Sequence, residues 1–132
     1  MTQPEDQAKL TALWMAKADD ALASADLELR ADHQTFAVNR TYYACFYAVT
    51  ALLHEHGKQF ARHSGVLSEF RRTFIKTGRL DKAWGSFYHK LFEDRQEGDY
   101  LPTRTFSAED VSERLTKTRE FVSIIRTLVD DS

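Results

Sequence analysis

A chain of 132 residues has the usual size of one folding unit, and 42% hydrophobic and 29% charged residues are typical of a globular protein rather than a disordered one. The single cysteine, Cys45, excludes a disulfide framework and a multi-cysteine metal site. The first residues form no apolar signal core, and the longest apolar stretch, residues 42–53, is too short to span a bilayer. We therefore expect one cytoplasmic domain over residues 1–132, with no membrane segment.

Charge is spread unevenly along the chain, although the net charge is only −2. Residues 1–34 hold 3 basic and 7 acidic side chains, residues 58–90 hold 8 and 2, and residues 91–132 hold 6 and 10. The middle segment attracts phosphate groups by Coulomb steering, but such a segment is also typical of a solvated helix face. Both interpretations stay open.

Helical periodicity begins close to the N-terminus. Pro4 suits a first helical turn, and from Leu10 to Leu29 apolar residues recur every three or four positions. A second helix is predicted over residues 34–56, with Gly57 as its C-terminal cap. Because residues 42–53 are apolar nearly all round, this helix is expected to be central, or to face both the core and another subunit.

Three more helices are predicted in the second half. The third begins near His63 and ends at Gly78, and the fourth begins near Asp81 and carries an apolar stripe that continues to Arg95. The fifth follows a break over residues 98–106 and starts with a capping box at Ser107. The sequence therefore predicts an all-α protein, a bundle of helices joined by short turns.

Arg95, Asp99 and Tyr100 form a polar end to the apolar stripe of the fourth predicted helix. An arginine cannot lose its charge, so Arg95 needs a partner or a water-filled pocket, and Asp99 is the nearest candidate. A pair with this spacing stabilises an exposed helix by only about 0.2–0.5 kcal/mol. A structural ion pair and a binding site both fit this pattern.

Asn39 and Arg40 pose the same question at the start of the second helix. Their polar ends can reach solvent at the edge of the core, or they can bind a ligand, since a guanidinium suits phosphate or carboxylate. If consecutive helices are antiparallel, His63 and Arg95 are neighbours at one end of the bundle, and Arg40 lies about 20 Å away at the other. A site that uses both arginines then needs two subunits.

No signature of a metal or cofactor site is present. The five histidines form no His-Glu-x-x-His or Cys-His array, and there is no phosphate-binding glycine loop, nucleophile elbow or paired-carboxylate pattern. We expect neither a metal nor a cofactor.

Four stretches, in their order and spacing, resemble the small stand-alone branch of the HEPN domain family: Asn39-Arg40-Thr-Tyr-Tyr-Ala44, His63-Ser-Gly65, Phe74-Ile-Lys-Thr-Gly-Arg-Leu80 and Arg95-Gln-Glu-Gly-Asp-Tyr100. The resemblance covers nearly the whole chain. It implies a HEPN-like antiparallel bundle of four main helices plus an additional helix, commonly a homodimer, with a role around RNA or nucleotides. Many HEPN proteins are metal-independent ribonucleases, and prokaryotic members often pair with a minimal nucleotidyltransferase in toxin–antitoxin modules.

The ribonuclease branch has an Arg followed, after four to six residues, by a His that transfers protons at the ribose 2′-hydroxyl or the leaving oxygen. Arg95 matches the Arg, but the positions of the His hold Tyr100, Leu101 and Pro102. Tyr100 is a poor base at neutral pH, although it can donate a hydrogen bond or stack on a base. His63 can substitute if the helix geometry above holds.

Two functional hypotheses follow. In the one we favour, a dimer binds a nucleotide, RNA or a nucleotidyltransferase partner through Arg95, Tyr100, Asn39, Arg40 and Asp99, aided by a basic face of Arg72, Lys76 and Arg79. In the other, the dimer cleaves RNA without a metal, with Arg95 stabilising the phosphorane charge and His63 or Tyr100 transferring protons. If a nucleotidyltransferase partner exists, Tyr100 can also be its nucleotide acceptor. The apolar second helix is the predicted dimer interface.

Overall fold

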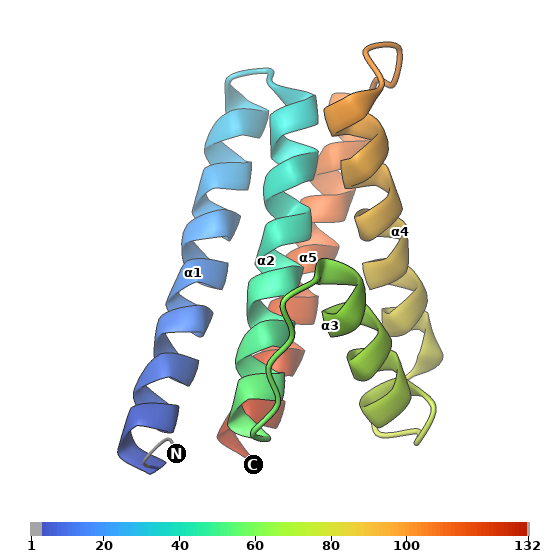
Figure 1. The fold of residues 1–132 in the computed structure, drawn as a ribbon. Helices are drawn as coiled ribbons and strands as arrows, with labels where there is room; N and C mark the ends of the chain where they lie inside the picture. Colours follow the sequence, from blue (N-terminus) through green and yellow to red (C-terminus); the bar gives the residue numbers. More distant parts are fainter. Residues whose placement is uncertain (1–3, 132) are drawn as a thin grey trace.

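The structure, a computed structural model, describes residues 4–131. This part of the chain folds into four long helices, one shorter helix and a π-helical turn: α1 (Pro4–Arg30), α2 (Gln34–Glu55), α3 (His63–Phe70), η1 (Arg71–Ile75), α4 (Lys82–Tyr100) and α5 (Ala108–Asp130). No strand occurs among these residues. The predicted all-α bundle of four main helices and an additional helix is confirmed (Figure 1).

The helices do not alternate strictly in direction (Figure 1). α2 runs antiparallel to α1. The connecting segment, residues 56–62, runs back along the bundle, so α3 has the same direction as α2. α4 then returns, and α5 runs down beside it. As a result, the C-terminal end of α4 lies at the same end of the bundle as the start of α2.

Helix ends follow the local signals in the sequence. The Asp81 carboxylate accepts the Ala83 N–H at 2.8 Å at the start of α4, and Ser107 Oγ accepts the Asp110 N–H at 3.1 Å at the start of α5. Gly57 follows α2 in a left-handed conformation with φ of 75°, which a residue with a Cβ adopts only at a cost. These caps confirm the predicted positions of three helix ends.

α2 is the central helix and packs against α1, α3, α4 and α5. Its Tyr42 is fully buried, and the core beside it is aromatic, with ring contacts that join Phe70, Tyr88 and Phe121 of three other helices. The predicted central position of this helix is confirmed. None of the helices within residues 4–131, α2 included, has the length and apolar character needed to cross a membrane.

α1 packs mainly through small residues. Ala18, Ala21 and Ala25 are buried, whereas Leu10 and Leu13 remain 41% and 56% exposed. The apolar stripe predicted for this helix is therefore wider than the face it buries, since Leu10 and Leu13 lie at its exposed edge.

Gly98 allows α4 to continue to Tyr100, where the sequence predicts a break. A Cβ at Gly98 would lie 3.2 Å from Phe106 Cε2 and 3.4 Å from Thr35 Cγ2. The missing side chain thus lets the last turn of α4 pack closely against the start of α2 and the loop before α5. This contact brings Asp99 to Asn39.

A buried carboxylate fixes α4 to α5. Asp94 is 1% exposed, and its oxygens lie 2.6 Å from Arg114 Nη1, 3.2 Å from Lys90 Nζ and 3.6 Å from Arg104 Nη2. Although burial alone raises the pKa of Asp94, the hydrogen bonds and charges of Arg114 and Lys90 hold it below the ordinary 3.8. Asp94 therefore stays ionised at neutral pH.

Candidate functional site

Arg95 is nearly buried at the end of α4 and lies against aromatic rings. Its side chain is 12% exposed, and its Cζ lies 4.8 Å from the centroid of the Tyr42 ring and 5.7 Å from that of Tyr43. The nearest carboxylate oxygen, Asp99 Oδ2, is 3.6 Å from Nη1, and the buried Nε has no hydrogen-bond partner among the described residues. Ring faces hold this guanidinium through cation–π attraction, and its charge is only loosely neutralised.

His63 opens α3 beside these rings. Its Nδ1 lies 2.8 Å from the hydroxyl of Tyr42, and its ring stacks on Phe46 with centroids 4.0 Å apart. Burial and the charge of Arg95 lower the pKa of His63 below 6.5, so the imidazole is neutral at pH 7. Burial also raises the pKa of Tyr42 far above 10, although Arg95 opposes this effect, so the phenol stays protonated. The predicted proximity of His63 and Arg95 is thus found in the structure.

A polar network extends from Asp99 to α1. Asn39 Nδ2 donates to both Asp99 oxygens, at 3.2 and 3.3 Å. Arg40 donates from Nη1 to Asn39 Oδ1 and from Nε to Ser24 Oγ, the latter at 3.1 Å. We call Arg95, Asp99, Asn39 and Arg40 the Arg95 cluster; it holds two guanidinium groups and one carboxylate.

This network corrects one expectation. The prediction that Arg40 lies at the opposite end of the bundle from Arg95 was wrong, because it assumed that consecutive helices are antiparallel. Since α3 runs in the same direction as α2, α4 ends beside the start of α2 (Figure 1). Both arginines therefore belong to one cluster within a single protomer.

Comparison with known proteins identifies the family of this chain. The sequence matches the HEPN domain over residues 11–128. The chain belongs to the HEPN domain family. It is 40% identical to "UPF0332 protein" of Thermotoga maritima over 126 residues, which cover 96% of each chain. It is also 34% identical to "Putative toxin MJ0142" of Methanocaldococcus jannaschii over 107 residues, which cover 81% of this chain and 73% of the relative.

Tyr100 of this HEPN domain lies apart from the Arg95 side chain. Five residues along a helix correspond to a rotation of about 140°, so Tyr100 faces another direction than Arg95. Its side chain makes no hydrogen bond or ring contact with any described residue, and it is 75% exposed. The structure therefore brings His63, and not Tyr100, to Arg95 within one protomer.

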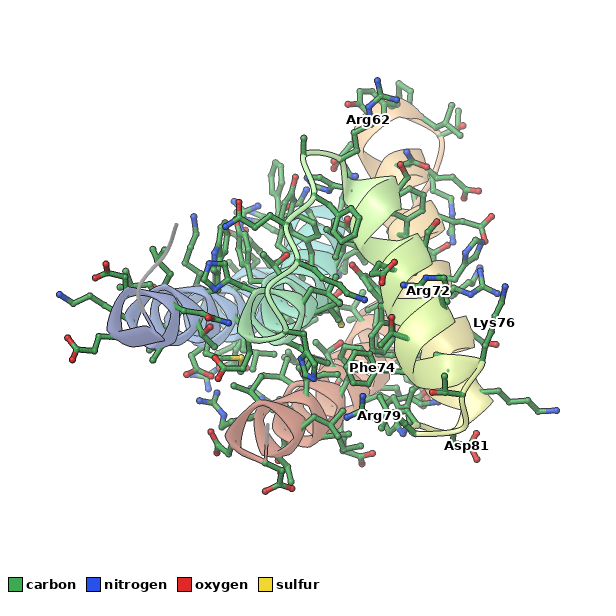
Figure 2. All side chains as sticks on the ribbon, turned by 60° about the horizontal axis from the view of Figure 1, so that its bottom comes forward. Arg62, Arg72, Phe74, Lys76, Arg79 and Asp81 are labelled. Atoms are coloured by element: carbon green, nitrogen blue, oxygen red, sulfur yellow. The ribbon has the colours of Figure 1, made fainter. Side chains whose placement is uncertain are left out.

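Arg72, Lys76 and Arg79 do not form one continuous face of the HEPN domain. Figure 2 shows Arg72 and Lys76 on the outer side of η1 and its following turn, and Arg79 on the side toward Phe74. Arg72 pairs with Glu69, whose pKa falls to about 2 chiefly through the hydrogen bond from Arg72. Arg79 Cζ lies 4.5 Å from the centroid of the Phe74 ring. Of these three, Lys76 has neither a paired carboxylate nor a ring contact among the described residues.

Sequence reasoning missed the role of Tyr42. The sequence places Tyr42 in an apolar run, but in the structure its ring contacts the Arg95 guanidinium and its hydroxyl lies 2.8 Å from His63 Nδ1. The available signal was the position of Arg95 on an apolar stripe, since a buried guanidinium requires a partner, and an aromatic face supplies one.

Proposed function

We propose that this HEPN domain is the toxin-like component of a two-protein module and that it binds a phosphate group, from RNA or a nucleotide, at the Arg95 cluster. The charge imbalance of the cluster carries the proposal. Arg95 is only loosely paired with Asp99, and Arg40 is hydrogen-bonded to the uncharged Asn39 and Ser24. Guanidinium groups with spare donors suit a phosphate, which accepts two hydrogen bonds from one arginine.

The toxin role draws on the relatives, two of which, "Putative toxin MJ0142" and "Putative toxin MJ0605" of M. jannaschii, carry toxin names. A toxin requires a partner that neutralises it, and a minimal nucleotidyltransferase fits this role. The exposed Tyr100 at the end of α4 is accessible to such a partner, and it is a suitable nucleotide acceptor.

We also propose a homodimer through α2. α2 presents the half-buried ring of Phe46, which stacks on His63 at the start of α3; a second copy can cover this ring while Tyr43 and Tyr47, which border α1, stay accessible. Because Phe46 stacks on His63, whose pKa is lowered by the nearby charge of Arg95, this arrangement places the two Arg95 clusters near the dimer axis. Light scattering that gives a mass near 30 kDa supports the dimer, and a mass near the 15.2 kDa of one chain contradicts it.

A metal-independent ribonuclease is the second candidate, and the contact between Tyr42 and His63 favours it. A neutral imidazole can take the proton from the ribose 2′-hydroxyl as its oxygen attacks the phosphorus, and Arg95 can stabilise the phosphorane charge. As the bond between phosphorus and the 5′-oxygen breaks, the protonated imidazole gives its proton to that oxygen, and the products are a 2′,3′-cyclic phosphate and a free 5′-hydroxyl. Tyr42 keeps the His63 ring in place.

One experiment tests the binding proposal and separates the two candidates. Labelled single-stranded RNA is incubated with the protein in EDTA, and its binding is followed by fluorescence anisotropy and its integrity by gel. Binding of intact RNA that Arg95→Ala weakens at least tenfold supports the proposal, with Arg119→Ala, an exposed arginine of α5, as the control. Cleavage that Arg95→Ala abolishes establishes the ribonuclease instead. Intact RNA that Arg95→Ala and Arg119→Ala bind with equal affinity contradicts both candidates.

A further inference from the structure

A hollow of about 330 Å³ between α1 and α2 adjoins the Arg95 cluster. It is lined by Lys17, Asp20 and Ser24 of α1 and by Arg40, Tyr43 and Tyr47 of α2. Arg40 belongs both to this hollow and to the Arg95 cluster, and Tyr43 contacts the guanidinium of Arg95. The volume falls within the range of small-ligand sites, about 300–1,000 Å³.

Cations stand at the two ends of the hollow. At one end, Arg40 is hydrogen-bonded to Ser24, and at the other, Lys17 Nζ lies 4.9 Å from the centroid of the Tyr47 ring. Neither cation forms an ion pair with a carboxylate of residues 4–131, although Asp20 lies between them. The lining therefore keeps a net positive charge.

The two ends of the hollow lie about two turns of α1 apart. Seven residues of α1, from Lys17 to Ser24, correspond to about 10 Å along the helix. An aromatic end at Tyr47, where the Trp14 ring lies 5.9 Å away, thus faces a phosphate-binding end at Arg40. This spacing matches a ligand that carries a flat ring at one end and a phosphate at the other.

Two other hollows lack this combination. The one between α1 and α2 near Leu10 and Phe60 is mostly apolar, and the one between α1 and α5 is bordered by the ion pair of Arg126 with Asp19. Neither joins aromatic rings to unpaired cations beside the Arg95 cluster.

We infer that the hollow of Lys17, Asp20, Ser24, Arg40, Tyr43 and Tyr47 is a subsite for one nucleotide unit, either free or part of an RNA strand. The base stacks at Tyr47, the phosphate binds at Arg40 and Ser24 next to Arg95, and Asp20 accepts hydrogen bonds from the ribose hydroxyls. This inference rests on the proposed binding of RNA or nucleotide at the Arg95 cluster, and it names the neighbouring unit.

Trp14 provides a direct probe. The chain has two tryptophans, so Trp84→Phe leaves Trp14 as the only one, 5.9 Å from Tyr47. A nucleoside monophosphate that stacks at Tyr47 is expected to change the Trp14 fluorescence with a saturable dependence on concentration, and inorganic phosphate is not. No saturable change with any of the four monophosphates, together with unchanged RNA binding by the variants below, overturns the inference.

Two variants test the end of the hollow that holds the base, each against a matched control. Lys17→Glu is compared with Lys9→Glu, the same change at an exposed lysine of α1, and Tyr47→Leu with Phe36→Leu, an exposed ring of α2. Since stacking of one base and one cation contact each contribute about tenfold to affinity, both test variants are expected to bind RNA at least tenfold more weakly, and the controls as the parent does.

The outcomes distinguish this inference from the proposed function. If Arg95→Ala loses RNA binding while Lys17→Glu and Tyr47→Leu bind RNA and monophosphate normally, the subsite is refuted and the proposed function stands. If Lys17→Glu and Tyr47→Leu lose binding while Arg95→Ala keeps it, the subsite stands and the proposed role of Arg95 fails. If Lys17→Glu and Tyr47→Leu lose only the binding of monophosphate, the ligand is a free nucleotide. If they lose the binding of both monophosphate and RNA, the ligand is a unit of an RNA strand.

Discussion

Tyr42→Phe removes a single oxygen atom from the centre of the candidate site. Tyr42 is fully buried, and its hydroxyl lies 2.8 Å from His63 Nδ1. The ring remains, so its packing and its contact with Arg95 are kept. The variant loses one hydrogen bond, for a net destabilisation of about 1 kcal/mol, because His63 is only half buried and its nitrogen can bind water instead. In a chain of this size, that corresponds to a lower melting temperature by about 3–5 °C.

Tyr42→Leu is the matched comparison, because it removes the ring face as well. Urea unfolding and RNA binding are measured for both variants. Tyr42→Phe is expected to bind RNA as the parent does, whereas Tyr42→Leu binds more weakly, since Arg95 loses the ring that orients it. If the protein cleaves RNA, Tyr42→Phe lowers the rate without changing binding. Equal losses of binding in the two variants refute the assignment of the ring to Arg95 and of the hydroxyl to His63.

Three further predictions concern the frame of the site. Asp94→Ala is expected to lower the free energy of unfolding, measured by urea titration, by about 3 kcal/mol, because it leaves the nearly buried Arg114 unpaired. The control Glu97→Ala removes an exposed ion pair and is expected to lower it by less than about 1 kcal/mol. Because the pKa of Asp94 is depressed, its contribution is full above the ordinary 3.8 and is lost as pH falls through the lower folded value; equal pH profiles for parent and Asp94→Ala contradict this. Arg95→Met is expected to raise the pKa of His63, measured by NMR, toward but not to 6.5, because burial still lowers it, and no rise means that the two side chains are not neighbours in solution. Gly98→Ala is expected to lower the melting temperature, despite the helix propensity of alanine, because its Cβ meets the Phe106 ring; a higher melting temperature contradicts the close packing.

Local signals in the sequence were sufficient for most of the fold. Ser107 and Asp81 are side-chain caps and Gly57 takes a left-handed conformation, and each effect acts within a few residues, so helix ends can be read without tertiary information. Gly98 shows where this reasoning fails. A glycine usually weakens a helix. Here the close contact of Gly98 with Phe106, in the loop before α5, favours the helix over the predicted break.

The candidate site was predicted only in part, because its geometry depends on the direction of α3. Nothing in the residues between α2 and α3 indicates locally that this segment runs back along the bundle. For this reason the sequence predicts Arg40 at the opposite end of the bundle from Arg95. The contact of Arg95 with Tyr42 is likewise set by the packing of α4 on α2. The residue types of the Arg95 cluster could be selected from the sequence, while their assembly within one protomer required the tertiary structure.

The most direct test of phosphate binding at the Arg95 cluster compares how the parent protein and Arg95→Ala bind a labelled single-stranded RNA, in EDTA and at fixed salt. We expect saturable binding by the parent and at least tenfold weaker binding by Arg95→Ala, with the thermal stability of both proteins measured in parallel. Equal affinities, or no binding by a folded parent protein, contradict the assignment of the Arg95 cluster as a phosphate-binding site.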